Sequence, residues 1–324
     1  MMPILLAASG GEPGALEQFV QHCLIGLTFG SLIALIALGY TMVYGIIGLI
    51  NFAHGDLFML GSFLALSIVT ATVTALSGNS AGLAAVAAIV LSLAVVPVFC
   101  AGVNVAVDYL VYRPLRSAPK LAPLVSAIGV SFVFMNIGYF WGGAAPVNFP
   151  NLVSDKNILA HVGLDTIRFT WKDLLVVGIT VPIMVGLTLF VKFTRLGKAM
   201  RATEQNMTAA QLMGVSVDRV IAATFGIGGA LCGVASVVYA LHINTVSFQM
   251  GFQNGLYAFT AAVLGGIGNL PGAVLGGLLI GLVRSLGSAY LDERWTNALV
   301  FAILITILIF RPQGLLGAHA KEKV

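Results

Sequence analysis

Long uncharged apolar runs constrain the fold of this chain more than any other feature of its sequence. Residues 18–40 contain no Asp, Glu, Lys or Arg, and similar runs recur almost to the C-terminus. A helix of about 20 residues spans the hydrocarbon core of a bilayer. Hydrophobic residues make up 59% of the chain and charged residues only 9%, a composition that excludes a water-soluble globule. Because a helix satisfies its own backbone in lipid, we predict an all-α polytopic transmembrane bundle, with one membrane domain covering residues 1–324.

The positions of these runs predict the individual helices. We expect spans near 18–40, 56–77, 82–107, 121–142, 173–193, 217–241 and 295–311. The region 252–288 is too long for one span and is interrupted by glycines and a proline, so we divide it into 252–266 and 271–288. This division gives about nine spans. Eight spans with a re-entrant half-helix is the alternative, and it would leave the basic C-terminal tail outside.

The charges of the loops predict the orientation, since Lys and Arg are enriched in cytoplasmic loops. The loops at 108–120 and 193–217 are basic, as is the tail after residue 310, and we place all three inside. The N-terminus then lies outside and the C-terminus in the cytoplasm. The longest external loop is 143–172, in which acidic and basic residues are nearly balanced.

The segment 195–219 is polar, although it lies between apolar spans. Its basic beginning places it in the cytoplasm, and Ala, Met, Gln and Leu between Thr203 and Met213 favour a short amphipathic helix that ends at Gly214. We predict that this helix, about 203–214, docks a cytoplasmic partner. A solvated helix lying on the inner leaflet is the alternative.

The sequence lacks the motifs that are typical of several classes of function. The sequence has no phosphate-binding loop, no catalytic motif and no metal-ligand cluster, so we assign no catalytic residue, no metal site and no enzymatic activity. The net charge of +4 comes from basic residues in short loops, which indicates membrane lipid rather than nucleic acid as the partner. Ionisable residues inside the spans are few, which disfavours an ion-coupled carrier and favours a separate motor protein.

Two segments interrupt the apolar pattern and are candidates for a translocation path or a helix break. The first is NFAHGD at 51–56, where Asn51 or Asp56 could cap a half-helix beside His54. An ordinary turn at the headgroup level is the alternative interpretation. The second is the glycine-rich break near residue 270. Its candidate residues are Gly265, Gly266, Gly268 and Pro271.

Five stretches together resemble one family over nearly the whole chain. They are GLTFGSLIALIALGYTMVYGIIGLINFAHGDLFMLG at 26–61, YRPLRSAPKLAPLVSAIGVSF at 112–132, RLGKAMRATEQNMTAAQLMGVSVDRVIAATFGIGGAL at 195–231, FTAAVLGGIGNLPGAVLGGLLIGL at 259–282 and FRPQGLLG at 310–317. In this combination the chain resembles the LivH-type permease of bacterial branched-chain amino-acid ABC importers.

The resemblance implies a subunit of the bacterial inner membrane with defined partners. These are a second homologous permease subunit, two cytoplasmic ABC ATPase subunits that use ATP and Mg²⁺, and a periplasmic substrate-binding protein; no cofactor is bound by the chain itself. It also implies that the segment 203–214 is a coupling helix inserted into an ATPase. The residues expected in this contact are Arg201, Thr203, Glu204, Met213 and Gly214. A urea or short-amide importer permease and a gradient-driven carrier are the alternative functions.

Overall fold

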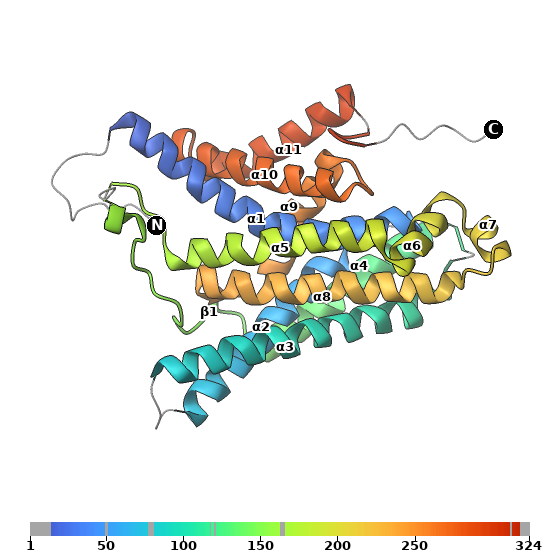
Figure 1. Cartoon of the computed structure of the whole chain (residues 1–324), viewed down its shortest axis with the longest axis horizontal. Helices are drawn as coiled ribbons and strands as arrows, with labels where there is room; N and C mark the ends of the chain where they lie inside the picture. Colours follow the sequence, from blue (N-terminus) through green and yellow to red (C-terminus); the bar gives the residue numbers. More distant parts are fainter. Residues whose placement is uncertain are drawn as a thin grey trace.

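The computed structural model describes residues 14–48, 51–76, 81–116, 118–119, 121–162, 166–311 and 313–317. It is a bundle of long helices that run roughly along one axis (Figure 1). The all-α prediction is confirmed. Among the described residues, the sole strands are β1 (Val147–Asn148) and β2 (Thr245–Val246), which form a short antiparallel ladder that the sequence did not predict.

Eight of the described helices are long and apolar enough to cross a membrane. They are α1 (Ala15–Ile47), α2 (Ala53–Ala75), α3 (Ala81–Val107, continued by a π-helical turn at Asp108–Tyr112), α4 (Leu121–Gly142), α5 (Trp171–Phe193), α8 (Val217–Ile243), α10 (Leu270–Tyr290) and α11 (Glu293–Phe310). The shorter helices are α6 (Arg195–Gln205), α7 (Met207–Leu212) and α9 (Met250–Gly265), with a 3-10 turn at Leu159–Val162. Each predicted span therefore corresponds to a helix.

The division of the region 252–288 is also confirmed, because α9 and α10 are separate helices. α9 has 16 residues. At 1.5 Å per residue it is about 24 Å long, shorter than the hydrocarbon core of about 30 Å. Whether α9 counts as a ninth span or as a re-entrant half-helix stays a prediction.

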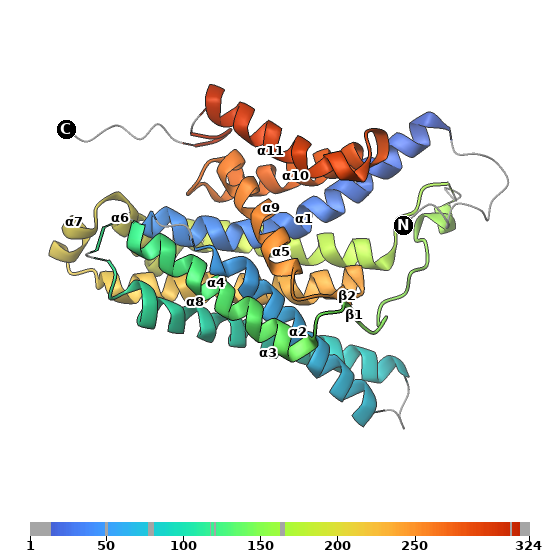
Figure 2. The same ribbon diagram turned by 180° about the vertical axis from the view of Figure 1, so that it is seen from behind.

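The two ends of the bundle differ. α6 and α7 project from one end, which we call the α7 end, and α5 begins at the opposite end, which we call the loop end because the 143–172 segment lies there (Figures 1 and 2). The basic tail residues Lys321 and Lys323, on which part of the predicted orientation rests, lie outside the described residues.

The core surrounds α1. Every residue from Leu32 to Leu38 is at most 1% exposed, so this helix is covered on all sides. α3 and α11 lie at opposite edges of the bundle in both views (Figures 1 and 2). α1 packs tightly on α10, where small residues let the two backbones touch: a Cβ added at Gly277 would lie 2.6 Å from the Cα of Ala34.

Candidate functional site

Asn51 and the start of α2 at Ala53 lie inside the bundle rather than at its end. The His54 ring packs against Gly39, which precedes the end of α1 at Ile47 by just over two turns, or about 12 Å. α2 therefore begins well below the end of α1, and Asn51, His54 and Asp56 are all at most 5% exposed. This burial fits the broken-helix interpretation. The choice between it and a turn at the headgroup level stays a prediction, because α1, with 33 residues or about 50 Å, is longer than the hydrocarbon core.

Asn51 is held by a buried polar network. The Tyr112 hydroxyl donates to Asn51 Oδ1 at 2.8 Å, and Asn51 Nδ2 donates to Asn104 Oδ1 at 3.4 Å. Asn104 in turn donates to the carbonyl oxygen of Phe225 at 2.7 Å. The network joins the break to α3 and α8. The sequence did not identify Asn104 or Tyr112, although an Asn inside an apolar run is a usable signal.

His54 and Asp56 are buried with incomplete hydrogen bonding. Among the described residues, neither ring nitrogen of His54 has a partner, and its ring meets the Tyr40 ring edge-on at 4.8 Å. Asp56 accepts a hydrogen bond from Ser131 through one carboxylate oxygen. The other oxygen has no partner and faces α9, where a Cβ at Gly251 would lie 2.7 Å from it. Buried polar atoms without partners mark this break as the candidate functional region of the membrane domain.

A small hollow lies between α1 and α9, next to this region. It is lined mainly by apolar and aromatic side chains, and the buried hydroxyl of Thr41 in its wall has no partner among the described residues. Its lining residues are Tyr40, Thr41, Tyr44, Phe259, Ala262, Val263 and Ile267.

The glycine-rich break between α9 and α10 is a tightly packed turn at the α7 end. A Cβ at Gly265 would overlap the backbone of Gly272, and Gly266 has a φ of 105°, which favours glycine. The segment after α11 packs on this turn, since Leu316 N donates to the Gly265 carbonyl at 3.0 Å. Gly268 also has positive φ, and Pro271 lies exposed in the first turn of α10.

The predicted docking helix at 203–214 is two helices rather than one. Asn206 leaves the helical conformation, with φ of −162°, and its side chain accepts from Ala209 N to cap α7. Asn favours such a cap over a helix interior, so α6 ends there. Two exposed apolar residues lie at the C-terminal end of α7: Leu212 is 83% exposed and Met213 is 84% exposed. Gly214 follows with φ of 81° and turns the chain toward α8.

The residues expected to contact an ATPase are not equally placed. Met213, Gly214 and Arg201 are exposed, and Arg201 donates to the Lys192 carbonyl at 3.1 Å. Thr203 is 1% exposed and donates to the Ala199 carbonyl. Its hydrogen bond therefore stays within α6, and its burial leaves no surface for a partner.

Glu204 is exposed, but its carboxylate lies beside the bundle. A Cβ at Gly268 would lie 3.3 Å from its Oε1, and one at Gly45 would lie 3.9 Å away. Partial burial raises the pKa of Glu204, and nearby Arg201 opposes this rise. Glu204 thus links α6 to the end of α1 and to the glycine-rich break.

An ion-pair network secures α8 at the α7 end. Asp218, in the first turn of α8, accepts from Arg113 at 2.9 Å and from Arg116 at 2.6 Å. Arg116 also pairs with Asp108 at 2.8 Å. The basic loop that predicted the orientation is therefore held against α8 by acidic partners.

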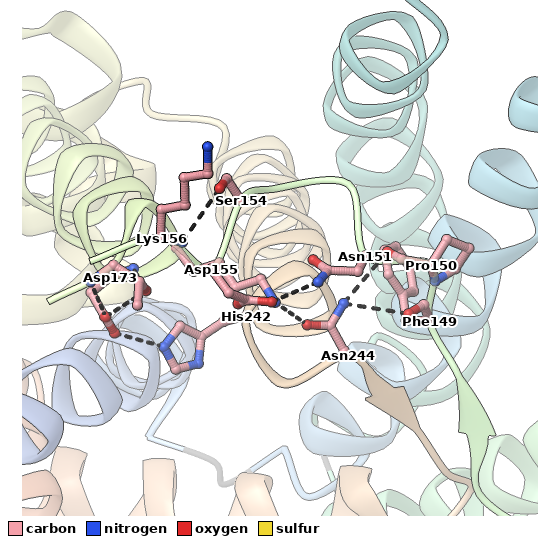
Figure 3. Close-up of polar contacts among 11 residues, drawn as sticks. Phe149, Pro150, Asn151, Ser154, Asp155, Lys156, Asp173, His242 and Asn244 are labelled. Atoms are coloured by element: carbon pink, nitrogen blue, oxygen red, sulfur yellow. Dashed lines mark hydrogen bonds and ion pairs between the residues drawn. The ribbon is translucent and has the colours of Figure 1, made fainter. Parts of the chain in front are cut away.

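A second polar cluster lies at the loop end (Figure 3). His242 of α8 contacts Asp173 of α5 at 3.0 Å, and Asn244 donates to the Phe149 carbonyl at 3.3 Å. These contacts hold the 143–172 loop on the bundle. The sequence identified no partner for His242, because Asp173 lies 69 residues away in the chain.

Among the described residues, no group of three or more His, Cys, Asp or Glu side chains is arranged to hold a metal ion.

The long apolar helices and their buried break define a polytopic helical membrane protein. A family model described as the branched-chain amino acid transport system permease component matches residues 23–308. This chain belongs to that family, whose members are transport permeases.

Relatives match over nearly the whole chain. It is 39% identical to the high-affinity branched-chain amino acid transport system permease protein BraD of Pseudomonas aeruginosa, over 95% of this chain and 98% of the relative. It is also 39% identical to LivH of Escherichia coli K12, over 94% of this chain and 98% of the relative. A probable LivH permease of Methanocaldococcus jannaschii is 28% identical over 91% of this chain and 92% of the relative. No solved structure matches.

Proposed function

We propose that this chain is the permease subunit of an ATP-driven ABC importer for leucine, isoleucine and valine. The observation that carries the proposal is the family match over residues 23–308, together with full-length relatives described as high-affinity branched-chain amino acid permeases. The chain would form half of the translocation path, and a second homologous permease would form the other half.

In this proposal, a cytoplasmic ATPase docks on the α7 end. The exposed apolar pair Leu212 and Met213 supports this role, because large apolar side chains at a projecting tip fit a partner's pocket better than water. Arg201 would orient the partner by charge. Thr203 would lie beneath this surface, where its buried side chain helps to hold α6 against the bundle.

In this proposal, Glu204 transmits the movement of the docked ATPase to the membrane domain. Its carboxylate lies next to Gly45 and Gly268, so a displacement of α6 acts directly on the end of α1 and on the α9–α10 break. We propose that ATP binding and hydrolysis move α6 and α7, and that this motion opens the path alternately to each side of the membrane. Asn51, His54 and Asp56 would contribute to that path.

The remaining partners follow from the same proposal. Two ATPase subunits would use ATP and Mg²⁺, and a periplasmic binding protein would deliver the solute to the loop end. The chain would lie in the inner membrane with its N-terminus outside and its C-terminus in the cytoplasm, as its basic loops predict.

Uptake into proteoliposomes tests the function. The permease is co-purified with its ATPases and binding protein, and uptake of labelled leucine and of urea is measured with and without internal ATP. We expect ATP-dependent leucine uptake. Urea uptake instead would reassign the solute, and uptake independent of ATP would reject the ABC mechanism in favour of a gradient-driven carrier.

A pair of variants tests the docking surface. The double substitution Leu212→Ser with Met213→Ser removes both exposed apolar side chains without disturbing a buried contact. We expect it to abolish co-purification of the ATPase while the permease stays folded. The control is Leu308→Ser on α11, a residue that is 36% exposed but distant in sequence from the proposed surface. Equal ATPase recovery from both variants would reject this docking surface.

A further inference from the structure

Arg284 carries a positive charge inside the apolar helix α10. Among the described residues it has no ion pair and no hydrogen bond, and its contacts are two aromatic rings. The guanidinium carbon lies 4.2 Å from the centroid of Phe29 and 4.9 Å from that of Tyr257. A charge at membrane depth is costly, so a cation held in this way without a counter-ion needs an explanation.

The register of α10 against α1 shows where this charge points. A Cβ at Gly26 would lie 2.9 Å from the Cα of Leu282, and one at Gly30 would lie 2.8 Å from the Cα of Leu278. In this antiparallel register, Arg284 is level with about residue 24 of α1, whereas its guanidinium lies over Phe29. The Cα atom of Phe29 is five residues from this level toward the α7 end, and its ring tilts part of the way back toward the N-terminus of α1, so the offset of the guanidinium is smaller but has the same direction.

The packing of α9 on α10 indicates the same direction for the side chain of Arg284. Gly276 packs on the backbone of Ala261, and Gly272 on that of Gly265, so the register places Tyr257 deeper than the Cα of Arg284. Side chains on a helix tilt toward its N-terminus, and α10 starts at the α7 end, where Gly268 lies beside Glu204. The guanidinium therefore points into the bundle. A side chain that snorkels to headgroups at the loop end would point the other way.

The surroundings of Arg284 are polar and open to the surface. The Tyr257 hydroxyl donates to Asn297 Oδ1, and Gln253 Nε2 donates to the Tyr257 hydroxyl at 3.4 Å. The side chains of Gln253 and Asn297 are exposed. α9 lies on the near face in Figure 2, beside α10 and α11. Amide groups exposed between apolar spans indicate a surface that faces water rather than lipid.

We propose that Arg284 binds the carboxylate of the amino acid as it passes through the membrane domain. The inference rests on the proposed import function and adds a solute-binding residue to it. Guanidinium presents parallel N–H donors that match the two oxygens of a carboxylate. Phe29 and Tyr257 hold the cation in place in the absence of solute, and the amides of Gln253 and Asn297 keep the surface hydrated.

Cysteine modification tests this site in the complete transporter. In a Cys23→Ser background, Arg284→Cys removes the charge, and a methanethiosulfonate reagent carrying a trimethylammonium or a sulfonate group then adds a positive or a negative one. We expect Arg284→Cys to lower ATP-dependent leucine uptake about tenfold or more. The trimethylammonium reagent should restore part of the uptake and the sulfonate reagent should not. Arg294→Cys, at an exposed arginine in the first turn of α11, is the matched control and should respond to neither.

Protection of the introduced cysteine identifies the ligand. Added leucine should slow its modification, while leucinamide, which lacks the carboxylate, should not. Slowing by anionic lipid but not by leucine would show that a lipid phosphate is the ligand and would overturn the proposal. So would a loss of uptake matched by loss of the folded complex on size-exclusion chromatography, since Arg284 would then serve folding alone.

The outcomes also separate this inference from the proposed function. A wild-type transporter that imports leucine with ATP, together with Arg284 variants that import it equally well, would overturn the carboxylate site and leave the function intact. A wild-type transporter that does not import leucine would overturn both.

Discussion

Lys172 joins the loop that contains Asp155 to α5 and α8, and its removal gives a prediction whose size can be worked out from the structure. Its side chain is 8% exposed and pairs with Asp155 at 2.7 Å, and it also donates to Asn244 Oδ1. Asn244 occupies the left-handed region, with φ of 57°, and binds the carbonyl of Phe149 (Figure 3). The ammonium group of Lys172 thus bonds to Asp155 in the loop and also to Asn244, which itself binds the loop at Phe149.

The substitution Lys172→Met keeps most of the aliphatic stem and removes the charge. Asn244 Oδ1 loses its donor in a half-buried place, which costs about 1–3 kcal/mol. The side chain of Asp155 is 44% exposed, so water replaces most of its lost ion pair, which contributes about 0–1 kcal/mol. We therefore expect the free energy of unfolding to fall by about 1–4 kcal/mol.

The same contact makes stability depend on pH. Burial raises the pKa of Asp155, but hydrogen bonds from Lys172 and Asn151 more than offset this, so its pKa lies below the ordinary 3.8. A depressed pKa stabilises the folded state above the unfolded pKa, and this stabilisation is lost as pH falls through the folded pKa. The destabilisation by Lys172→Met should therefore shrink as pH falls below about 4.

Thermal unfolding of the detergent-solubilised protein at about pH 7 and about pH 3 measures both effects. Lys156→Met is the matched control, because Lys156 is an exposed lysine in the same loop. Equal melting temperatures for the two variants at pH 7 would refute the assigned role of Lys172.

Two further substitutions test contacts within the bundle. Tyr112→Phe removes the buried hydrogen bond to Asn51 and should lower stability by about 1–2 kcal/mol in the same unfolding assay, and an unchanged midpoint would contradict the assigned network. Gly281→Leu places a side chain against the backbone of Gly30, so we expect loss of monodisperse protein on size-exclusion chromatography. Gly186→Leu, at a glycine whose Cβ position is open, should remain folded, and equal behaviour of the two leucine variants would count against the packing argument.

Much of the fold could be predicted because membrane insertion depends on local composition. The runs that predicted spans at 121–142 and 173–193 became α4 and α5 with ends within about two residues, and the glycine-rich break divided α9 from α10 as expected. Motifs spread along the chain also indicated the family to which it belongs. The sequence predicted a short helix at 203–214, but the division of this segment at Asn206 was missed, because helix propensity alone does not decide between a cap and an interior position. The docking role of the segment stays a prediction.

The sequence by itself determined where the chain can cross the membrane and which segments cannot enter it. It did so because apolar length and charge are properties of neighbouring residues. Only the tertiary structure decided that α2 begins about 12 Å below the end of α1. It alone also brought Asp173 to His242, and Phe29 and Tyr257 to Arg284. Those pairings depend on the register of helices that are distant in sequence, and backbone contact at small residues sets that register.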